Sequence, residues 1–526
     1  MARRRSKRGG CSHAKTARQS TQHAEEVMSE SQIADATGAG ENPGNTKSPD
    51  QKVKQPIGLL TLSSIEMWER FSFYGLQVIL AYYIYYSAGD GGLGLTEGEA
   101  LAITGAYGGA VYLGQPLGAW FADRLVPART MVMAGGVIIM AGHTSLAIIP
   151  GIPGLLIGLA LITIGTGALT PNAYAMVGRL YKEQSPRRDS GYAIFYTGIL
   201  VGALFGPLAT GYLQAEVGFH YGFGAAAVGM AIGLITYFLG RNTVPVESTV
   251  VPNPVNSAGK RNAAGFGIAL LAVIAVMVST GIVSTGNLNS YVLATILIVA
   301  IVYFVAMLRS KKVTADERLK VKAFIPLFIT GAIFWTMILQ LFTTFAVYAD
   351  TRVNLSIGSY SMPAAYISTF EVIAGIIVGP IIAAYGQKLA NRPNRRVPST
   401  TSKLAFGFVL MTFTFGLFAI FPLIFSGLIP IVAVIAGMIV MGITEVTYAP
   451  IGLSVASQLS PVAFNSQMMA LWGLTTAAGA SLSGFMGQLY SGTSEVGFFA
   501  LMTVISLLTA AFLYGLRGPL RRLGVA

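Results

Sequence analysis

The chain has 526 residues, of which 53% are hydrophobic and only 11% are charged, whereas globular proteins carry about 25% charged residues. This composition excludes an ordinary soluble protein and indicates a polytopic membrane protein. The single cysteine, Cys11, excludes an intrachain disulfide, and with only four histidines we expect no metal site and no cofactor. The net charge of +13 is accounted for by a basic tail and basic loops, so no nucleic-acid partner is expected.

Residues 1–54 differ from the rest of the chain. They hold ten Lys/Arg and six Asp/Glu residues and no apolar run. This composition is typical of disorder, and it lacks the apolar segment of a signal peptide. We predict a disordered basic tail that lies in the cytoplasm.

Stretches long and apolar enough to cross a bilayer, which takes roughly 20 residues as a helix, follow the tail. Fourteen such stretches are predicted at 57–86, 97–121, 129–150, 153–178, 190–213, 220–240, 263–282, 287–308, 323–348, 362–386, 402–425, 428–453, 464–490 and 495–516.

Basic residues gather in alternate connections between these stretches, and the intervening connections hold one base, Arg352. The positive-inside rule then predicts an even number of spans, with both termini in the cytoplasm. The bases on the predicted cytoplasmic side are Arg124, Arg129, Arg179, Lys182, Arg187, Arg188, Arg241, Lys260, Arg261, Arg309, Lys311, Lys312, Arg318, Lys320, Lys322, Lys388, Arg392, Arg395, Arg396, Lys403, Arg517, Arg521 and Arg522.

The seventh and eighth stretches carry no ionisable residue in their apolar cores. They are interpreted as two accessory helices between two groups of six, which predicts an all-α major facilitator fold with its site at the midplane between the halves. The predicted divisions are 55–242, 243–320 and 321–526. No GxSxG, HExxH or P-loop motif occurs, so we expect no catalytic residues and no enzyme activity.

The first stretch contains two acids and a base, Glu66, Glu69 and Arg70. A charge at the bilayer centre costs about 2.5–3.5 kcal/mol on insertion scales. The i,i+3 and i,i+4 spacings place all three on one helix face. One arginine neutralises one carboxylate, so the second acid is predicted to be left over and to exchange a proton. The alternative is a buried ion pair that only holds the first helix against its neighbours.

Three more ionisable residues lie within predicted spans. Glu445 has no base nearby in sequence and is predicted to face a cavity, with Pro450 breaking its helix one turn later. Glu371 lies in the tenth stretch, and His143, in the third, is interpreted as a packing residue. Aromatic residues at or near mid-span are Tyr74, Tyr112, Tyr196, Trp335 and Trp472.

These residues resemble the signatures of one family. The run Glu66-x-x-Glu69-Arg70-Phe71-x-Phe73-Tyr74-Gly75 resembles the ExxERFxYYG motif of the proton-dependent oligopeptide transporter (POT/PTR) family, a branch of the major facilitator superfamily. The resemblance covers about 57–516, and bacterial members have two extra helices that match the seventh and eighth stretches. Further segments that resemble family motifs are Gly118–Arg124, Gly165–Asn172, Arg187–Gly191, Phe195–Leu200, Tyr448–Leu453 and Met468–Trp472.

The resemblance implies proton-coupled symport of di- and tripeptides by a monomer in the plasma membrane. It implies that Glu66, Glu69 and Arg70 take part in proton coupling, and that Arg70 meets the peptide carboxylate. It further implies that Glu445 receives the α-amino group. The residues that would line the pocket are Tyr74, Tyr112, Trp335 and Trp472.

The sequence departs from the family pattern at several positions. Thr170 stands where the family has a lysine, Leu339 where it has an acid, Leu200 where it has an asparagine, and Phe73 where it has a tyrosine. Glu371 falls where the family usually has an asparagine. We hypothesise that Glu371 partly replaces the missing acid in proton coupling.

Two other functions remain open from the sequence. The first is a diverged transporter or exporter of another small molecule with altered proton coupling, which the loss of the family lysine favours. The second is a non-transporting membrane scaffold or sensor, which has no need of unpaired acids in the membrane.

Overall fold

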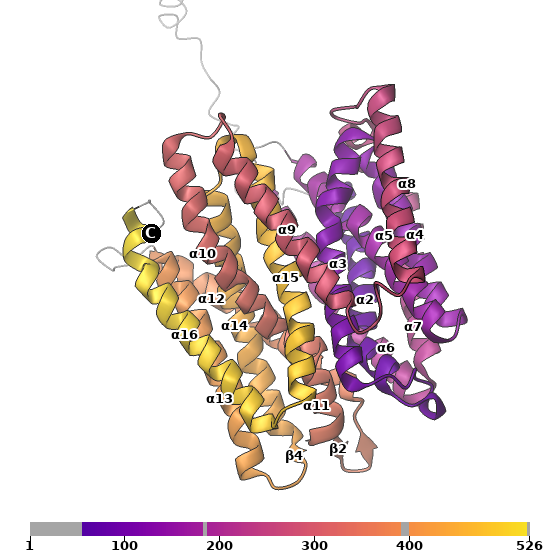
Figure 1. The fold of residues 1–526 in the computed structure, drawn as a ribbon, viewed down its shortest axis with the longest axis vertical. Coiled ribbons are helices and arrows are strands. Elements are labelled where there is room, and N and C mark those ends of the chain that lie inside the picture. The colour runs from indigo at the N-terminus through magenta and orange to yellow at the C-terminus, as the bar shows by residue number, and fades with distance from the viewer. Residues whose placement is uncertain (1–54, 182–186, 391–398, 523–526) are drawn as a thin grey trace, which may run out of the picture. The chain divides into compact units, whose positions relative to one another are not determined.

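The computed structural model describes residues 55–181, 187–390 and 399–522 (Figure 1). The predicted tail, with Cys11, lies outside the described residues, as do the predicted cytoplasmic bases Lys182, Arg392, Arg395 and Arg396.

Long helices make up almost all of the described chain, and they coincide in order with the fourteen predicted stretches. Those of 21 residues or more among the described residues are α2 (Ile57–Tyr85), α3 (Glu97–Arg124), α4 (Ala128–Ile148), α5 (Gly151–Arg179), α6 (Arg187–Glu216), α7 (Phe219–Gly240), α8 (Ser257–Ser279), α9 (Leu288–Arg309), α10 (Ala315–Ile338), α12 (Ile367–Ala390), α13 (Thr400–Ile424), α14 (Ile431–Gln458), α15 (Asn465–Ser491) and α16 (Glu495–Arg522).

Among the described residues, ten helices are long and apolar enough to cross a membrane. The other four long helices are α2, α3, α8 and α15. The all-helical membrane fold is therefore confirmed, and the number of fourteen spans stays a prediction.

Short elements connect the long helices. A 3₁₀ turn η3 (Leu339–Phe342) and helix α11 (Thr344–Arg352) continue α10, and β1 (Val353–Asn354) pairs in parallel with β4 (Ile429–Pro430). The strands β2 (Ser356–Ile357) and β3 (Tyr360–Ser361) form a small antiparallel hairpin. The remaining turns are η1 (Ala88–Asp90), η2 (Val246–Thr249), η4 (Ala364–Tyr366) and η5 (Val462–Phe464).

Capping residues set the starts of α3 and α10. Thr96 and Glu99 form a reciprocal capping box at α3, and Thr314 and Glu317 form one at α10. Each box pairs backbone N–H groups that have no partner within the helix. The box at Thr314 explains why α10 begins at Ala315, eight residues before the predicted stretch.

Two sets of helices pack mainly within themselves. Helices α2 to α7 contact one another, most closely where α2 meets α6, and α10 and α12 to α16 form the second set. Gly202 of α6 lies on the backbone of Met67 and Phe71, with no room for a Cβ. Small residues of this kind let membrane helices approach closely. The packing is compatible with the predicted division into two six-helix groups, whose boundaries stay predictions.

One end of the molecule joins the two sets. Helix α3 packs along α15, where Gly105 faces Gly484 without space for a Cβ, and α9 runs against both α3 and α15 (Figure 1). A continuous apolar core here includes Ile79 and Tyr82 of α2 together with Phe345 of α11. A second core lies among α2 to α7.

One local prediction is corrected by the structure. Pro450 does not break its helix, because α14 runs through it to Gln458. The break falls instead in the ninth stretch, at η3, where Gln340 accepts hydrogen bonds at Oε1 from the hydroxyls of Thr343 and Thr344. Those side-chain hydrogen bonds compete with helical geometry at this position.

Candidate functional site

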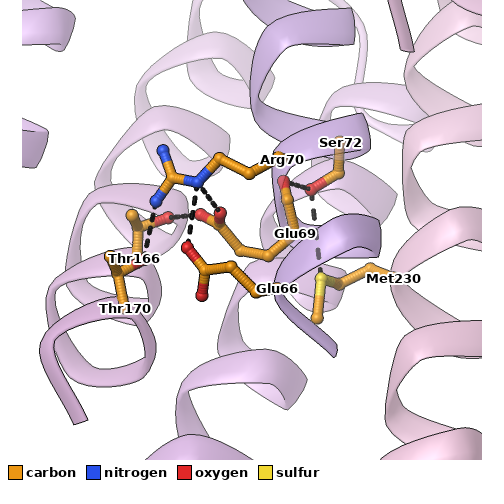
Figure 2. Close-up of polar contacts among 7 residues, drawn as sticks. All are labelled: Glu66, Glu69, Arg70, Ser72, Thr166, Thr170 and Met230. Carbon is orange, nitrogen blue, oxygen red and sulfur yellow. Dashed lines mark hydrogen bonds and ion pairs between the residues drawn. The ribbon is translucent and has the colours of Figure 1, made fainter. Parts of the chain in front are cut away.

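The three charged residues of α2 form one buried cluster (Figure 2). The Nε of Arg70 donates to Oε1 of Glu66 at 3.1 Å and lies 2.9 Å from Oε2 of Glu69. Glu66 and Glu69 are fully buried, and Arg70 is 5% exposed. Both carboxylates share a single guanidinium nitrogen, so neither acid lies apart from the base, and the prediction that the charge of one acid is left over stays a prediction.

Two threonines of α5 complete this cluster (Figure 2). Nη2 of Arg70 donates to Oγ1 of Thr170 at 2.8 Å, and Oγ1 of Thr166 donates to Oε1 of Glu69 at 3.0 Å. The i,i+4 spacing places both hydroxyls on the face of α5 that meets α2. Thr170 thus acts as a neutral acceptor where a lysine was expected from the resemblance.

The charge of the cluster does not balance when both acids are ionised, since two carboxylates face one guanidinium. Oε2 of Glu66 has no hydrogen-bond partner among the described residues. Burial of an unbalanced charge is costly, and protonation of one acid removes it. The arrangement can therefore hold one exchangeable proton.

A cavity of about 1580 Å³ adjoins this cluster and separates the two sets of helices. Arg70 lies on its wall, whereas Glu66 and Glu69 are not among its lining residues. The other predicted or altered residues that line it are Phe73, Tyr74, Tyr112, Thr170, Leu200, Trp335, Leu339, Glu371 and Glu445.

The opposite wall carries two acids. Glu371 of α12 is 5% exposed and Glu445 of α14 is half-buried. Gly442 packs against the backbone carbonyl of Glu371, and Glu445 lies three residues further along on the same face of α14. Both residues line the cavity at this seam between α12 and α14. Glu371 and Glu445 lie 74 residues apart in the sequence, and only helix packing brings them together.

Not every predicted residue reaches the cavity. Trp472 does not line it and instead packs over Gly452, near the ring of Tyr448 at a centroid distance of 6.5 Å. His143 is fully buried in α4, and neither ring nitrogen has a partner among the described residues. Lys403, which was predicted to lie in a connection, is in the first turn of α13 and lines the cavity, so a second base besides Arg70 faces this cavity.

The joined end of the molecule closes the cavity on one side. The hydroxyls of Tyr85 and Tyr86 donate to the two oxygens of Asp350 at 2.6 and 2.8 Å, and Tyr82 donates to the carbonyl of Ala346 at 3.0 Å. The hydroxyl of Tyr366 donates to the carbonyl of Leu208 at 3.0 Å. These contacts connect α2 to α11 and α6 to η4.

Thr166 and Asp350 are site residues that were not predicted from the sequence. Thr166 was visible as a hydroxyl one turn before Thr170, in a helix with few polar side chains. Asp350 had no sequence signal, because its partners lie more than 260 residues away.

Comparison with known proteins identifies the family to which this chain belongs. The sequence profile described as the POT family matches residues 129–505, which is more than half of the chain. The chain belongs to the POT family. The predicted resemblance is therefore confirmed, and the family is one of transporters rather than enzymes.

Relatives and solved structures of POT proteins align over most of this chain. It is 36% identical to the uncharacterized transporter YclF of Bacillus subtilis (strain 168), over 92% of this chain and 98% of the relative. It is also 36% identical to a di-/tripeptide transporter of Lactococcus lactis subsp. lactis (strain IL1403), over 89% and 96% of the two chains. A crystal structure of peptide transporter POT in complex with sulfate matches with a TM-score of 0.84 and 37% identity, over 89% and 96%.

A second solved POT structure carries a different ligand. A POT family transporter in complex with 5-aminolevulinic acid matches with a TM-score of 0.83 and 31% identity, over 88% of this chain and 96% of that chain.

Proposed function

We propose that this protein is a proton-coupled symporter of di- and tripeptides that works by alternating access. The observation that carries the proposal is a cavity with a guanidinium on one wall and carboxylates on the other. A zwitterionic peptide presents a carboxylate and an ammonium at its two ends, and charge-assisted hydrogen bonds hold such groups strongly. POT family membership and the di-/tripeptide transporter of Lactococcus lactis support the same substrate class.

The proton enters this scheme at Glu66 and Glu69. With one proton on the pair, Arg70 balances the remaining carboxylate and the cluster is neutral. Protonation also releases part of the guanidinium from its acids, so that Arg70 can meet the peptide carboxylate. Ion pairing in α2 and substrate binding compete for one side chain, and this competition couples proton uptake to peptide binding.

The other wall receives the amino end of the peptide. Glu445 accepts the α-ammonium, and Glu371 partly replaces the acid missing at Leu339. Trp335 contributes a donor, because its Nε1 is buried without a hydrogen-bond partner among the described residues and the side chain lines the cavity. Tyr74 and Tyr112 form the wall between the two charged ends.

We propose that the cavity is open to the cytoplasm in this structure. Its wall includes Tyr385 near the end of α12 and Lys403 at the start of α13, next to a predicted cytoplasmic connection. The tyrosines bound to Asp350 close the other side. In this proposal both termini lie in the cytoplasm, as the loop charges predict, and the protein acts as a monomer in the plasma membrane, as the family resemblance implies.

A second candidate is transport of another small zwitterion. Thr170 and Leu339 stand at positions where the family has a base and an acid. The solved POT transporter in complex with 5-aminolevulinic acid supports this alternative within the same fold. A scaffold is disfavoured by the charged cavity, which a non-transporting protein has no need to maintain.

Uptake into proteoliposomes tests these proposals. The full chain is reconstituted, a pH gradient is imposed, and entry of labelled dialanine is followed with and without a protonophore. Uptake that collapses with the protonophore supports peptide–proton symport. Failure with dialanine combined with uptake of 5-aminolevulinic acid supports the second candidate, and binding without flux of either compound contradicts transport.

A further inference from the structure

We infer that the Glu371–Glu445 pair makes this transporter selective for peptides whose first residue carries a second amino group, such as lysyl-alanine. The inference rests on the proposed function and adds a substrate class to the same cavity.

Packing holds the two acids together. Gly442 lies directly on the carbonyl of Glu371. One turn further along α12, a Cβ atom on Gly375 would lie 3.4 Å from the side chain of Val446. The seam between α12 and α14 therefore keeps residue 371 beside residue 445. Neither carboxylate forms an ion pair with a base among the described residues.

The surrounding groups do not neutralise this pair. Tyr196 of α6 lines the same cavity and carries a phenol rather than a basic group. Arg70 is held by its own two acids on the opposite wall. Lys403 also lines the cavity but forms no ion pair with either acid among the described residues. One substrate ammonium balances one carboxylate, so the second needs either a proton or another cation.

Two further polar atoms on the cavity wall are free to bind a ligand. Gln77 is 5% exposed and lines the cavity, and its Oε1 has no hydrogen-bond partner among the described residues. Nε1 of Trp335, on the wall of the same cavity, is also buried without a hydrogen-bond partner among the described residues. Buried polar groups are normally paired, so a bound substrate can supply a hydrogen-bond partner to each of these atoms.

The position of the second cation decides the effect. In lysyl-alanine both ammonium groups belong to the residue that enters the acidic wall, so one meets Glu445 and the other meets Glu371. In alanyl-lysine the second ammonium belongs to the residue at the other end, toward Arg70, where like charges repel. The two peptides are isomers with the same net charge, which separates a specific site from general attraction by an acidic cavity.

Competition against exchange of labelled dialanine tests the inference. The full chain is reconstituted without a pH gradient, and inhibition by lysyl-alanine, alanyl-lysine and unlabelled dialanine is compared. The concentration of lysyl-alanine that halves the exchange is expected to be about tenfold lower than that of alanyl-lysine or of unlabelled dialanine. Equal inhibition by the two isomers overturns the inference.

Two substitutions assign the effect to Glu371. Glu371→Gln is expected to abolish the preference between the isomers, and Glu371→Asp, which keeps the charge, to retain part of it. A preference that survives in Glu371→Gln overturns the inference. If this variant no longer exchanges dialanine, the ratio of the affinities for lysyl-alanine and alanyl-lysine is measured by calorimetry on the purified protein.

The test distinguishes this inference from the proposed function. If dialanine is exchanged without preference for lysyl-alanine, only the selectivity fails. If none of the three peptides binds or exchanges, peptide transport itself fails, and the selectivity with it.

Discussion

Nη2 of Arg70 donates a hydrogen bond to Oγ1 of Thr170, at 2.8 Å, across the contact between α2 and α5. The hydroxyl holds the guanidinium without adding charge, which a lysine at this position would do. The cluster therefore balances its two acids with one base and, in the proposed mechanism, one proton.

The first prediction concerns this hydrogen bond. Thr170→Val removes the acceptor, and hydrogen bonds to charged groups contribute about 1.5–3 kcal/mol. Proton-driven dialanine uptake is expected to fall by about tenfold or more, measured in proteoliposomes at equal protein content. Thr170→Ser keeps a hydroxyl and serves as the control. Equal uptake in the valine and serine variants would show that the hydrogen bond is dispensable.

The second prediction concerns the shape of the cation. Arg70→Lys keeps one positive charge but loses the planar fork that contacts Glu66, Glu69 and Thr170 together. Proton-driven uptake is expected to be strongly reduced, and the concentration of dialanine needed for half-maximal exchange to rise. Full transport by Arg70→Lys would refute the proposed competition for the guanidinium.

The third prediction separates coupling from binding at the acid pair of α2. Glu69→Gln removes an ionisable group but keeps an acceptor for the hydroxyl of Thr166. Uptake driven by a pH gradient is expected to be lost, whereas exchange of labelled for unlabelled dialanine continues, because exchange requires no net proton movement. Loss of both reactions in a well-folded variant would argue for a structural ion pair instead.

The fourth prediction concerns the replacement of the missing acid. Glu371→Gln is expected to weaken proton-driven uptake. Leu339→Glu in the same chain is expected to restore part of it, because residue 339 lines the same cavity. Unchanged proton-driven uptake in Glu371→Gln would end the hypothesis that Glu371 takes part in coupling.

The fifth prediction concerns the closed end of the cavity. Asp350→Asn weakens the acceptors of two charge-assisted hydrogen bonds from Tyr85 and Tyr86. The closed side is expected to open more often, so that a cysteine placed at Ser368 reacts faster with an impermeant thiol reagent added outside. Cys11 is the single native cysteine, and Cys11→Ser gives a clean background. An unchanged labelling rate would show that these hydrogen bonds do not control opening.

The sequence alone determined the class of the protein, the order of its helices and the residues of its first signature. Those inferences rest on properties that are local in the chain, namely apolar length, loop charge and the i,i+3 and i,i+4 spacings on one helix. The site residues on single helices, such as Glu66, Glu69 and Arg70, were found for the same reason.

Tertiary structure decided how residues on different helices combine. The pairing of Arg70 with Thr170, the approach of Glu371 to Glu445 and the contact of Tyr85 with Asp350 join positions that lie between 74 and 265 residues apart. Helix packing also explains why Trp472, which was predicted to line the cavity, does not do so. The helix break lies at Gln340 and not at the predicted Pro450. Such contacts depend on which helix faces meet, and small residues such as Gly202 and Gly442 allow those faces to pack closely. The periodicity of residues along one helix does not encode which faces of different helices meet.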